Sequence, residues 1–146
     1  MRVRAVELAD REQWLRMRSD LWPESPEDHP REIDMYFRGE SGEPVAVLVA
    51  DRGDTLIGLA ELSIRAYAEG CSTQNAGYLE GWYVDPDHRG QGVGRALIEA
   101  SEAWARAQGC VEFASDTALD NESSRKAHLA CGFTETGLIR CFVKTL

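Results

Sequence analysis

The sequence feature that most limits what this chain can fold into is a glycine-rich turn between an apolar strand and an amphipathic helix. Residues 84–98 read VDPDHRGQGVGRALI, with Gly90, Gly92 and Gly94 alternating where the helix begins. Residues without a Cβ let backbone N–H groups approach a ligand closely, and the positive end of the helix dipole points the same way. The segment therefore predicts an anion-binding turn that suits a phosphate.

Two common nucleotide-binding motifs do not fit this turn. A P-loop ends in Gly-Lys-Ser or Gly-Lys-Thr, and residues 94–96 read GRA. A dinucleotide fingerprint needs an acidic residue closing the next strand, and the spacing here gives no confident match. The predicted phosphate-binding turn is therefore neither a P-loop nor a dinucleotide-binding motif.

The turn, read as RGQGVG over residues 89–94, resembles the (Arg/Gln)-x-x-Gly-x-(Gly/Ala) pyrophosphate loop of the GNAT superfamily of acyl-CoA-dependent N-acetyltransferases. A second segment, NESSRKAHLACGF at 121–133, resembles the Asn-containing helix ending in Gly-Phe of the same superfamily. A glycine-tightened helix entry that serves packing alone competes with the first motif but does not explain the second. The resemblance implies the GNAT fold and acetyl-CoA as co-substrate.

Composition predicts one globular domain over residues 1–146, long enough to bury a core. The net charge of −9 argues against nucleic acid and anionic membranes as partners and favours a cationic ligand. The longest apolar run, 45–50, is too short to cross a bilayer, and the charged N-terminus lacks a signal-peptide core. We therefore expect a cytoplasmic protein. The four cysteines show no metal-binding spacing, so we expect them reduced and expect no metal.

Hydrophobic periodicity predicts an α/β fold with a central mixed sheet and helices on both faces. An N-terminal capping box of Asp10 and Gln13 is expected to open the first helix, and Pro30 to keep the next from starting before Glu32. Gly81 interrupts a central strand, which indicates a bulge or a close backbone approach. The expected strands are 2–8, 44–51, 55–67, 78–84, 111–115 and one or two within 133–146; the expected helices are 10–22, 32–38, 92–108 and 121–130.

Further segments narrow the resemblance to the aminoglycoside 6'-N-acetyltransferases, across nearly the whole chain. These segments are 21–23 (LWP), 63–67 (SIRAY), 70–71 (GC), 79–81 (LEG) and 114–117 (ASDT). The likeness implies that Trp22 and Tyr67 shape an aminoglycoside site, and that Glu80 and Asp116 bind its ammonium and hydroxyl groups. Trp22 could equally close a helix against the core, Tyr67 could end a strand, and Asp116 could cap a turn.

The resemblance also implies direct acetyl transfer from acetyl-CoA to a primary amine, without a covalent enzyme intermediate. Asp116 or Glu80 is expected to accept the proton of the amine, directly or through water, and a backbone N–H near Tyr83 or Val84 to meet the oxyanion. His128 occupies the position of a tyrosine that many GNAT enzymes use to protonate the leaving thiolate, and a structural or cofactor-contacting role stays open. Asn121 contacts the pantetheine by the resemblance, or is an ordinary helix cap. The expected cofactor-binding residues are Trp82, Tyr83, Val84, Arg89, Gly90, Gln91, Gly92, Val93, Gly94, Arg95 and Asn121.

Two other functions stay open at this point. One is the same chemistry on another amine, such as a polyamine, a peptide N-terminus or a small metabolite. The other is a non-catalytic acyl-CoA-binding sensor, which Glu80 and Asp116 argue against because a sensor needs no acceptor pocket. A homodimer paired through the C-terminal strand is expected, and an antibiotic-resistance role follows from the resemblance.

Overall fold

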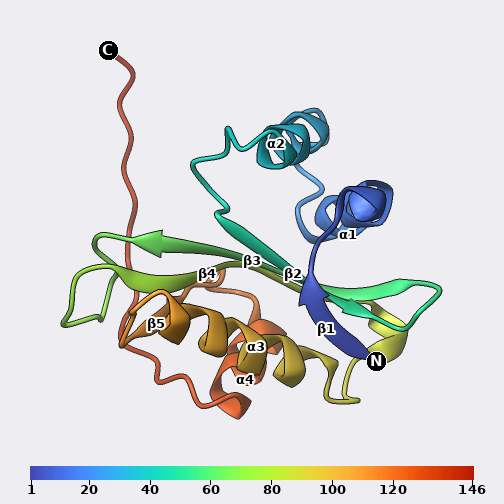
Figure 1. Ribbon diagram of the computed structural model, residues 1–146. Helices are drawn as coiled ribbons and strands as arrows, with labels where there is room; N and C mark the ends of the chain where they lie inside the picture. The colour runs from blue at the N-terminus through green and yellow to red at the C-terminus, as the bar shows by residue number, and fades with distance from the viewer.

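Five strands form one mixed sheet with two helices on each face (Figure 1). The computed structural model describes residues 1–146. The strand order is β1-β2-β3-β4-β5; neighbours in the first four pair antiparallel, and β4 pairs parallel with β5. Helices α1 and α2 cover one face, and α3 and α4 the other (Figure 1). The expected mixed α/β fold is confirmed.

The elements follow the chain with short connections. The strands are β1 (Arg2–Ala5), β2 (Ala46–Asp51), β3 (Leu56–Arg65), β4 (Ala76–Val84) and β5 (Phe113–Ser115). The α-helices are α1 (Arg11–Leu21), α2 (Asp28–Phe37), α3 (Val93–Ala107) and α4 (Glu122–Ala130), and two short 3-10 helices span Leu8–Asp10 and Pro86–His88. None of the helices combines the length and the apolar character needed to cross a membrane.

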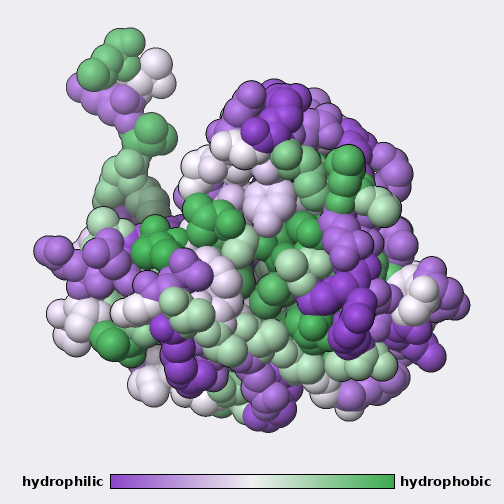
Figure 2. Space-filling view, viewed as in Figure 1, coloured by the Kyte–Doolittle hydropathy of each residue, from purple (hydrophilic) through white to green (hydrophobic).

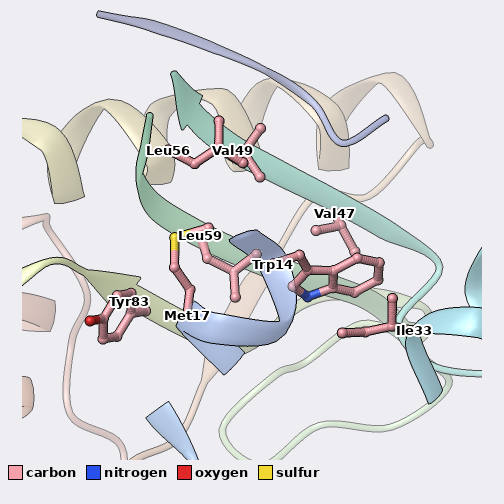
Figure 3. Packing of buried hydrophobic residues seen from close by; sticks show 8 residues of the cluster. All are labelled: Trp14, Met17, Ile33, Val47, Val49, Leu56, Leu59 and Tyr83. Atoms are coloured by element: carbon pink, nitrogen blue, oxygen red, sulfur yellow. The ribbon is translucent and has the colours of Figure 1, made fainter. Parts of the chain in front are cut away.

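Two apolar layers hold the helices to the sheet, because alternate strand residues face opposite sides. Trp14 and Met17 of α1, both fully buried, pack with Ile33 of α2 onto strand residues of the sheet face that α1 and α2 cover (Figure 3). The rings of Tyr36 and Phe37 meet the edge of Trp14 at centroid distances of 5.2 and 5.6 Å. The layer under α3 is built from Ala50, Ile57, Ala60, Leu62, Leu79, Val93, Leu97 and Ile98.

The starts of the first two helices differ from expectation. Asp10 occupies the N-cap position of α1, but its side chain does not bond the helix; the carboxylate accepts hydrogen bonds from Arg4 and from the N–H of Glu7. Gln13 instead accepts the N–H of Leu56 at 2.7 Å, so it ties α1 to β3. Helix α2 begins at Asp28, before Pro30, because a proline in the first turn loses no helical hydrogen bond.

A β-bulge interrupts the pairing of β3 with β4. Glu61 lies opposite Gly81 while Leu62 lies opposite Leu79, which leaves Glu80 as the extra residue of β4. The interruption expected at Gly81 is therefore confirmed. An extra residue shifts the alternation of side chains, so Glu80 and Gly81 both face α1. A Cβ added at Gly81 would lie 2.6 Å from the Trp22 ring, so only glycine fits there.

The strands expected within 133–146 are absent from this chain. The C-terminal segment touches the body through an ion pair of Glu135 with Arg125 at 3.0 Å, and residues 137–146 then leave the sheet (Figure 1). We call residues 137–146 the C-terminal arm. Its Phe142 and Val143 are 92% and 97% exposed, and Figure 2 shows hydrophobic side chains projecting from the body. The alternating pattern of a strand is present, but the arm meets no strand edge with which to pair.

Truncation of the buried Met17 side chain tests the core under α1. Met17→Ala is expected to lower the free energy of unfolding by about 2–5 kcal/mol, because the fully buried thioether would leave a cavity. Urea denaturation followed by circular dichroism measures this. The control Leu8→Ala, at a residue 67% exposed, should change the value by less than about 0.5 kcal/mol. Equal losses in the two variants would contradict the assignment of this core.

Candidate functional site

The site lies where β4 and β5 part. The two strands pair only as far as Leu79 and Ser115, after which β5 ends and β4 continues to Val84. The stretch of β4 beyond Leu79 therefore has a strand partner on one edge only. Such an opening in a sheet presents unpaired backbone groups to a ligand.

Val84 presents its amide to this open edge. Asp85 N–H donates to the Ile57 oxygen at 2.9 Å, so Asp85 faces β3. Backbone groups of successive residues in a strand face opposite edges, so Tyr83 also faces β3 while Val84 and Trp82 face the opening. The Val84 oxygen confirms this direction, because it accepts a hydrogen bond from Arg89 Nε at 2.8 Å.

The glycine turn after β4 leads into the open end of α3. Gly90 and Gly92 have φ angles of +72° and +86°, and a Cβ added at either would meet no atom within 4 Å. Gly92 caps α3 without a side-chain cap, and no acidic residue lies in the first turn, so the amides of the first turn stay free at the positive end of the helix. The donor set fits a diphosphate.

The third glycine of the turn has a packing role. A Cβ added at Gly94 would lie 3.0 Å from the Trp82 ring. The polar side chains of the turn bind backbone oxygens nearby: Gln91 donates to Asp87 at 3.1 Å, and Arg95 donates to Ala130 at 2.7 Å, which joins α3 to α4. The sequence alone did not separate these roles within residues 89–95.

An acidic cavity of about 280 Å³ lies on the α1 and α2 side of the opening. It is lined by Arg18, Trp22, Glu32, Glu43, Pro44, Glu61 and Glu80. Four carboxylates and one guanidinium give it an excess of negative charge, which favours a cationic ligand.

The floor of the cavity is a buried ion pair. Glu61 is 1% exposed, accepts the Trp14 indole N–H at 2.7 Å and lies 3.0 Å from Arg18 Nε. Burial raises the pKa of Glu61, and the nearby Arg18 opposes that shift. Arg18 also pairs with Glu32 at 2.5 Å, while its Nη1 has no partner. Arg18 lines the cavity although only 6% of the residue is exposed.

A chain of contacts joins Glu80 to Asp116. Arg65 donates to both carboxylate oxygens of Glu80 at 2.8 and 2.7 Å, and the hydroxyl of Ser63 also donates to Glu80. Arg65 stacks on the Tyr78 ring at 3.6 Å from its centroid. The Tyr78 hydroxyl donates to Asp116 Oδ2 at 2.5 Å, so these two predicted site residues belong to one network.

The two carboxylates differ in how strongly they are held. Burial opposes the ionisation of Glu80, but the hydrogen bonds from Arg65, Glu43 and Ser63 outweigh it and lower the pKa of Glu80. Asp116 is exposed and uses only Oδ2 to accept the Tyr78 hydroxyl. Burial and the neighbouring Asp116 raise the pKa of the Tyr78 hydroxyl, so it stays a donor at neutral pH.

Glu43 is a pocket residue that the sequence did not single out. It precedes β2, lines the cavity beside Glu80 and lies 3.8 Å from Arg65 Nη2. Hydrogen bonding with the Glu80 carboxylate, followed by burial, raises the pKa of Glu43 to about 7. Two carboxylates this close share a proton, because both cannot be ionised without cost.

The remaining predicted residues lie as follows. The Trp22 ring lines the cavity and packs against Gly81. Tyr67 is 70% exposed and does not line the cavity; its hydroxyl lies 3.4 Å from Glu69. Asn121 caps α4, because its Oδ1 accepts the Ser124 N–H at 3.1 Å. The alternative of an ordinary helix cap is thus the role that this structure gives Asn121.

His128 lies on the opposite side of the sheet from the cavity. Its ring meets the edge of Trp82 at a centroid distance of 5.1 Å, and its Nε2 lies 2.8 Å from Ser115 Oγ. Ser115, like Glu43, Arg65 and Tyr78, was not identified from the sequence as a site residue. Arg65 and Ser115 do lie within segments that carried the resemblance, 63–67 and 114–117, whereas Glu43 and Tyr78 lie in none of them. Membership of a segment did not reveal which partner each side chain meets.

The comparisons with known proteins agree with this geometry. Residues 12–133 match the acetyltransferase (GNAT) family, and the chain belongs to that family of acyl-group transferases. Within it, the chain is 53% identical over 146 residues to aminoglycoside N(6')-acetyltransferase type 1 of Klebsiella aerogenes, covering 99% of this chain and 96% of that protein.

Solved structures show the same fold. The aminoglycoside 6'-N-acetyltransferase AAC(6')-IG from Acinetobacter haemolyticus superposes with a TM-score of 0.91 at 37% identity, covering 100% of this chain and 99% of that one. AAC(6')-Iy, solved in complex with the bisubstrate analogue CoA-S-monomethyl-acetylneamine, also gives 0.91, at 34% identity and with 99% and 98% covered.

A change of Glu43 tests the shared proton. Glu43 is protonated below about pH 7 and ionised above it, so the cavity gains a negative charge as the pH rises. The KM for a polycationic acceptor is therefore expected to fall between pH 6 and 8, on top of any change that the acceptor amines cause. In Glu43→Gln this step should be lost, and the KM at pH 8 should rise about 3- to 10-fold.

Steady-state kinetics at several pH values and constant ionic strength measure both effects. Glu40→Gln, an exposed carboxylate on the preceding turn that pairs with Arg38, is the matched control. If Glu43→Gln and Glu40→Gln keep the same pH profile as the parent protein, Glu43 does not contact the acceptor.

Proposed function

We propose that the protein is an acetyl-CoA-dependent aminoglycoside 6'-N-acetyltransferase and that it confers antibiotic resistance. The acidic cavity beside the opened β4 edge carries this proposal, since a polycationic amino sugar suits its carboxylates. The curated relative at 53% identity bears this activity in its name, and the covered lengths leave no large part of either chain unmatched. The bisubstrate analogue bound to AAC(6')-Iy joins coenzyme A and an acetylated neamine in one ligand.

The glycine turn is the proposed site of the coenzyme A diphosphate. The free amides at the start of α3 supply donors, and the open space at Gly90 and Gly92 supplies room. Trp82, Val84 and Arg89 would lie along the pantetheine by the same proposal, and acetyl-CoA would supply an activated acetyl thioester. Contacts of Tyr83, Gln91, Val93, Gly94, Arg95 and Asn121 with it stay predictions.

The acceptor amine is placed by the network on the cavity side. Glu80 suits an ammonium group, because a carboxylate held by Arg65 and Ser63 keeps its charge. Trp22 offers a flat wall against a sugar ring. Tyr67 is proposed to act only at the exposed mouth, since it lies outside the cavity.

Asp116 is the better candidate for accepting the first proton. An acceptor ammonium must lose a proton before its nitrogen can attack a carbonyl. Both oxygens of Glu80 accept hydrogen bonds from Arg65, whereas Asp116 is an exposed residue that accepts the Tyr78 hydroxyl through Oδ2 alone. The Val84 amide on the open edge suits the developing oxyanion. No metal takes part in this proposal.

We also propose that the protein is a homodimer and that it acts in the cytoplasm. The exposed apolar side chains of the C-terminal arm support the dimer, because single chains rarely leave such a segment uncovered. Strand β5 lies at the end of the sheet and spans only three residues, so its free edge can receive a strand from a second copy.

The function is tested by thiol release from acetyl-CoA with kanamycin and tobramycin, and by drug susceptibility after expression in a sensitive host. Turnover with both drugs and a raised inhibitory concentration are expected. Asp116→Asn should lower kcat about 100-fold and leave the KM for acetyl-CoA within about twofold. Absence of thiol release with any aminoglycoside would remove the acceptor assignment.

Gly92→Val separates the two substrates in the same assay. A side chain there would strain a backbone of positive φ and crowd the turn, so the KM for acetyl-CoA should rise at least 10-fold. Gly53→Val is the matched control, because Gly53 also has a positive φ with open space but lies in the turn between β2 and β3. Equal effects of the two valines would contradict a diphosphate site.

The dimer is tested by measuring the molar mass with light scattering as the protein elutes from a size-exclusion column. Twice the monomer mass is expected for the full chain, and the monomer mass for a chain that ends at Gly137. Loss of the arm should leave the far-ultraviolet circular dichroism nearly unchanged, since the arm forms no helix or strand in this structure. A full-length monomer at micromolar concentration would contradict the proposal.

A further inference from the structure

Ser115 and His128 form a hydrogen-bonded pair at the point where the sheet opens. Ser115 is the last residue of β5 to pair with β4, opposite Leu79. Its Oγ lies 2.8 Å from His128 Nε2, and the next nearest acceptor, the Leu79 oxygen, is at 3.4 Å. The pair therefore joins the end of β5 to α4.

The surroundings of His128 fix which ring nitrogen carries the proton. His128 Nδ1 lies 2.7 Å from the backbone oxygen of Ser124, which can only accept a hydrogen bond. Nδ1 must therefore be the donor, and Nε2 of the neutral ring has no proton. It follows that the Ser115 hydroxyl donates to Nε2, so the imidazole acts toward Ser115 as a base.

The pair has no carboxylate to balance a lasting positive charge. The ring of His128 is held by Trp82 at 5.1 Å and Phe133 at 5.2 Å between centroids. No ring nitrogen of His128 lies within 4 Å of an acidic oxygen, in contrast to a triad in which an aspartate stabilises the imidazolium. Such a ring suits a proton that is held briefly and then returned.

The side chains of Ser115 and Asp116, at the end of β5 and just after it, face opposite sides of the opening. Side chains alternate along a strand, so Ser115 faces α4 while Asp116, the next residue, meets Tyr78 on the cavity side. A reacting group lodged in the opening would thus lie between one carboxylate and one hydroxyl. Two proton transfers are needed there: the acceptor ammonium loses its first proton, and the attacking nitrogen loses a second as the amide forms.

We propose that Ser115 and His128 carry this second proton from the acceptor nitrogen to the leaving sulfur, an inference that rests on the function proposed above. As the C–N bond forms, Ser115 Oγ accepts a proton from the nitrogen and passes its own proton to His128 Nε2. As the C–S bond breaks, His128 returns a proton through Ser115 to the sulfur. The nitrogen has lost one proton, the thiol has gained it, and the pair is restored without a bond to the enzyme.

In this relay Ser115 is the catalytic residue and His128 acts through it. Ser115→Ala is expected to slow acetyl transfer about 100-fold in single-turnover measurements, with the KM values of both substrates within about twofold. Ser115→Thr, which keeps the hydroxyl, should restore most of the rate. His128→Gln keeps a hydrogen-bonding partner for Ser115 but cannot hold the proton, so it should be as slow as Ser115→Ala, and the double variant no slower.

Two further measurements distinguish a proton relay from a purely structural hydrogen bond between β5 and α4. The solvent deuterium isotope effect on the single-turnover rate should fall to that of a one-proton step in both slow variants. Nitrogen-proton correlation spectra of the protein without substrates should show the Nδ1–H tautomer for His128, assigned by its loss in His128→Gln. The chain has only three histidines, so this assignment is direct.

The outcomes are distinguishable. If the parent protein acetylates no aminoglycoside, the proposed function fails and the relay fails with it. If the parent is active and His128→Gln transfers acetyl equally fast, or if the ring carries its proton on Nε2, only the relay is overturned. A change confined to the KM for acetyl-CoA or to thermal stability would also overturn it.

Discussion

The extra residue in β4 determines how the two halves of the site meet. Because Glu80 is unpaired in the ladder with β3, the strand shifts its alternation, and Glu80 and Gly81 face the same side. Trp22 then packs over the glycine while the glutamate meets Arg65. The bulge lies at the level where β5 stops pairing, so the acidic cavity adjoins the unpaired edge of β4. The cavity proposed for the acceptor and the strand edge proposed for acetyl-CoA are adjacent for this reason.

A buried ion pair of Glu61 with Arg18 forms part of the cavity wall. Glu61 and Arg18 are almost wholly buried, and an ion pair of this kind is costly unless each partner is satisfied. Trp14 and Glu32 supply further partners, so α1 and α2 are joined to β3 by polar contacts as well as apolar packing. The Nη1 atom of Arg18 is buried and makes no hydrogen bond. The residue that anchors the helices is therefore also part of the cavity wall.

Local patterns in the sequence predicted what depends on local chemistry. The hairpin of β2 and β3, the amphipathic α3 and the interruption at Gly81 were all predicted correctly, since turn residues and periodicity determine them. Glu80 and Asp116 were placed near each other by resemblance, but Arg65 and Tyr78, which connect them, depend on contacts between strands distant in sequence. Gln13 was misread as a cap because its true partner, Leu56, is 43 residues away. The C-terminal arm has the alternating hydrophobic pattern of a strand, but such a pattern does not show whether a neighbouring strand is available for pairing.

The close contact between Gly81 and Trp22 limits how substrate preference can change in evolution. Any side chain at residue 81 would collide with the indole ring, so this wall of the cavity is closed to substitution without moving α1. Glu43 sits on a loop with its side chain half exposed, and a substitution there disturbs no packed layer. Variants that accept new drugs should therefore accumulate along the loop before β2 and not along β4.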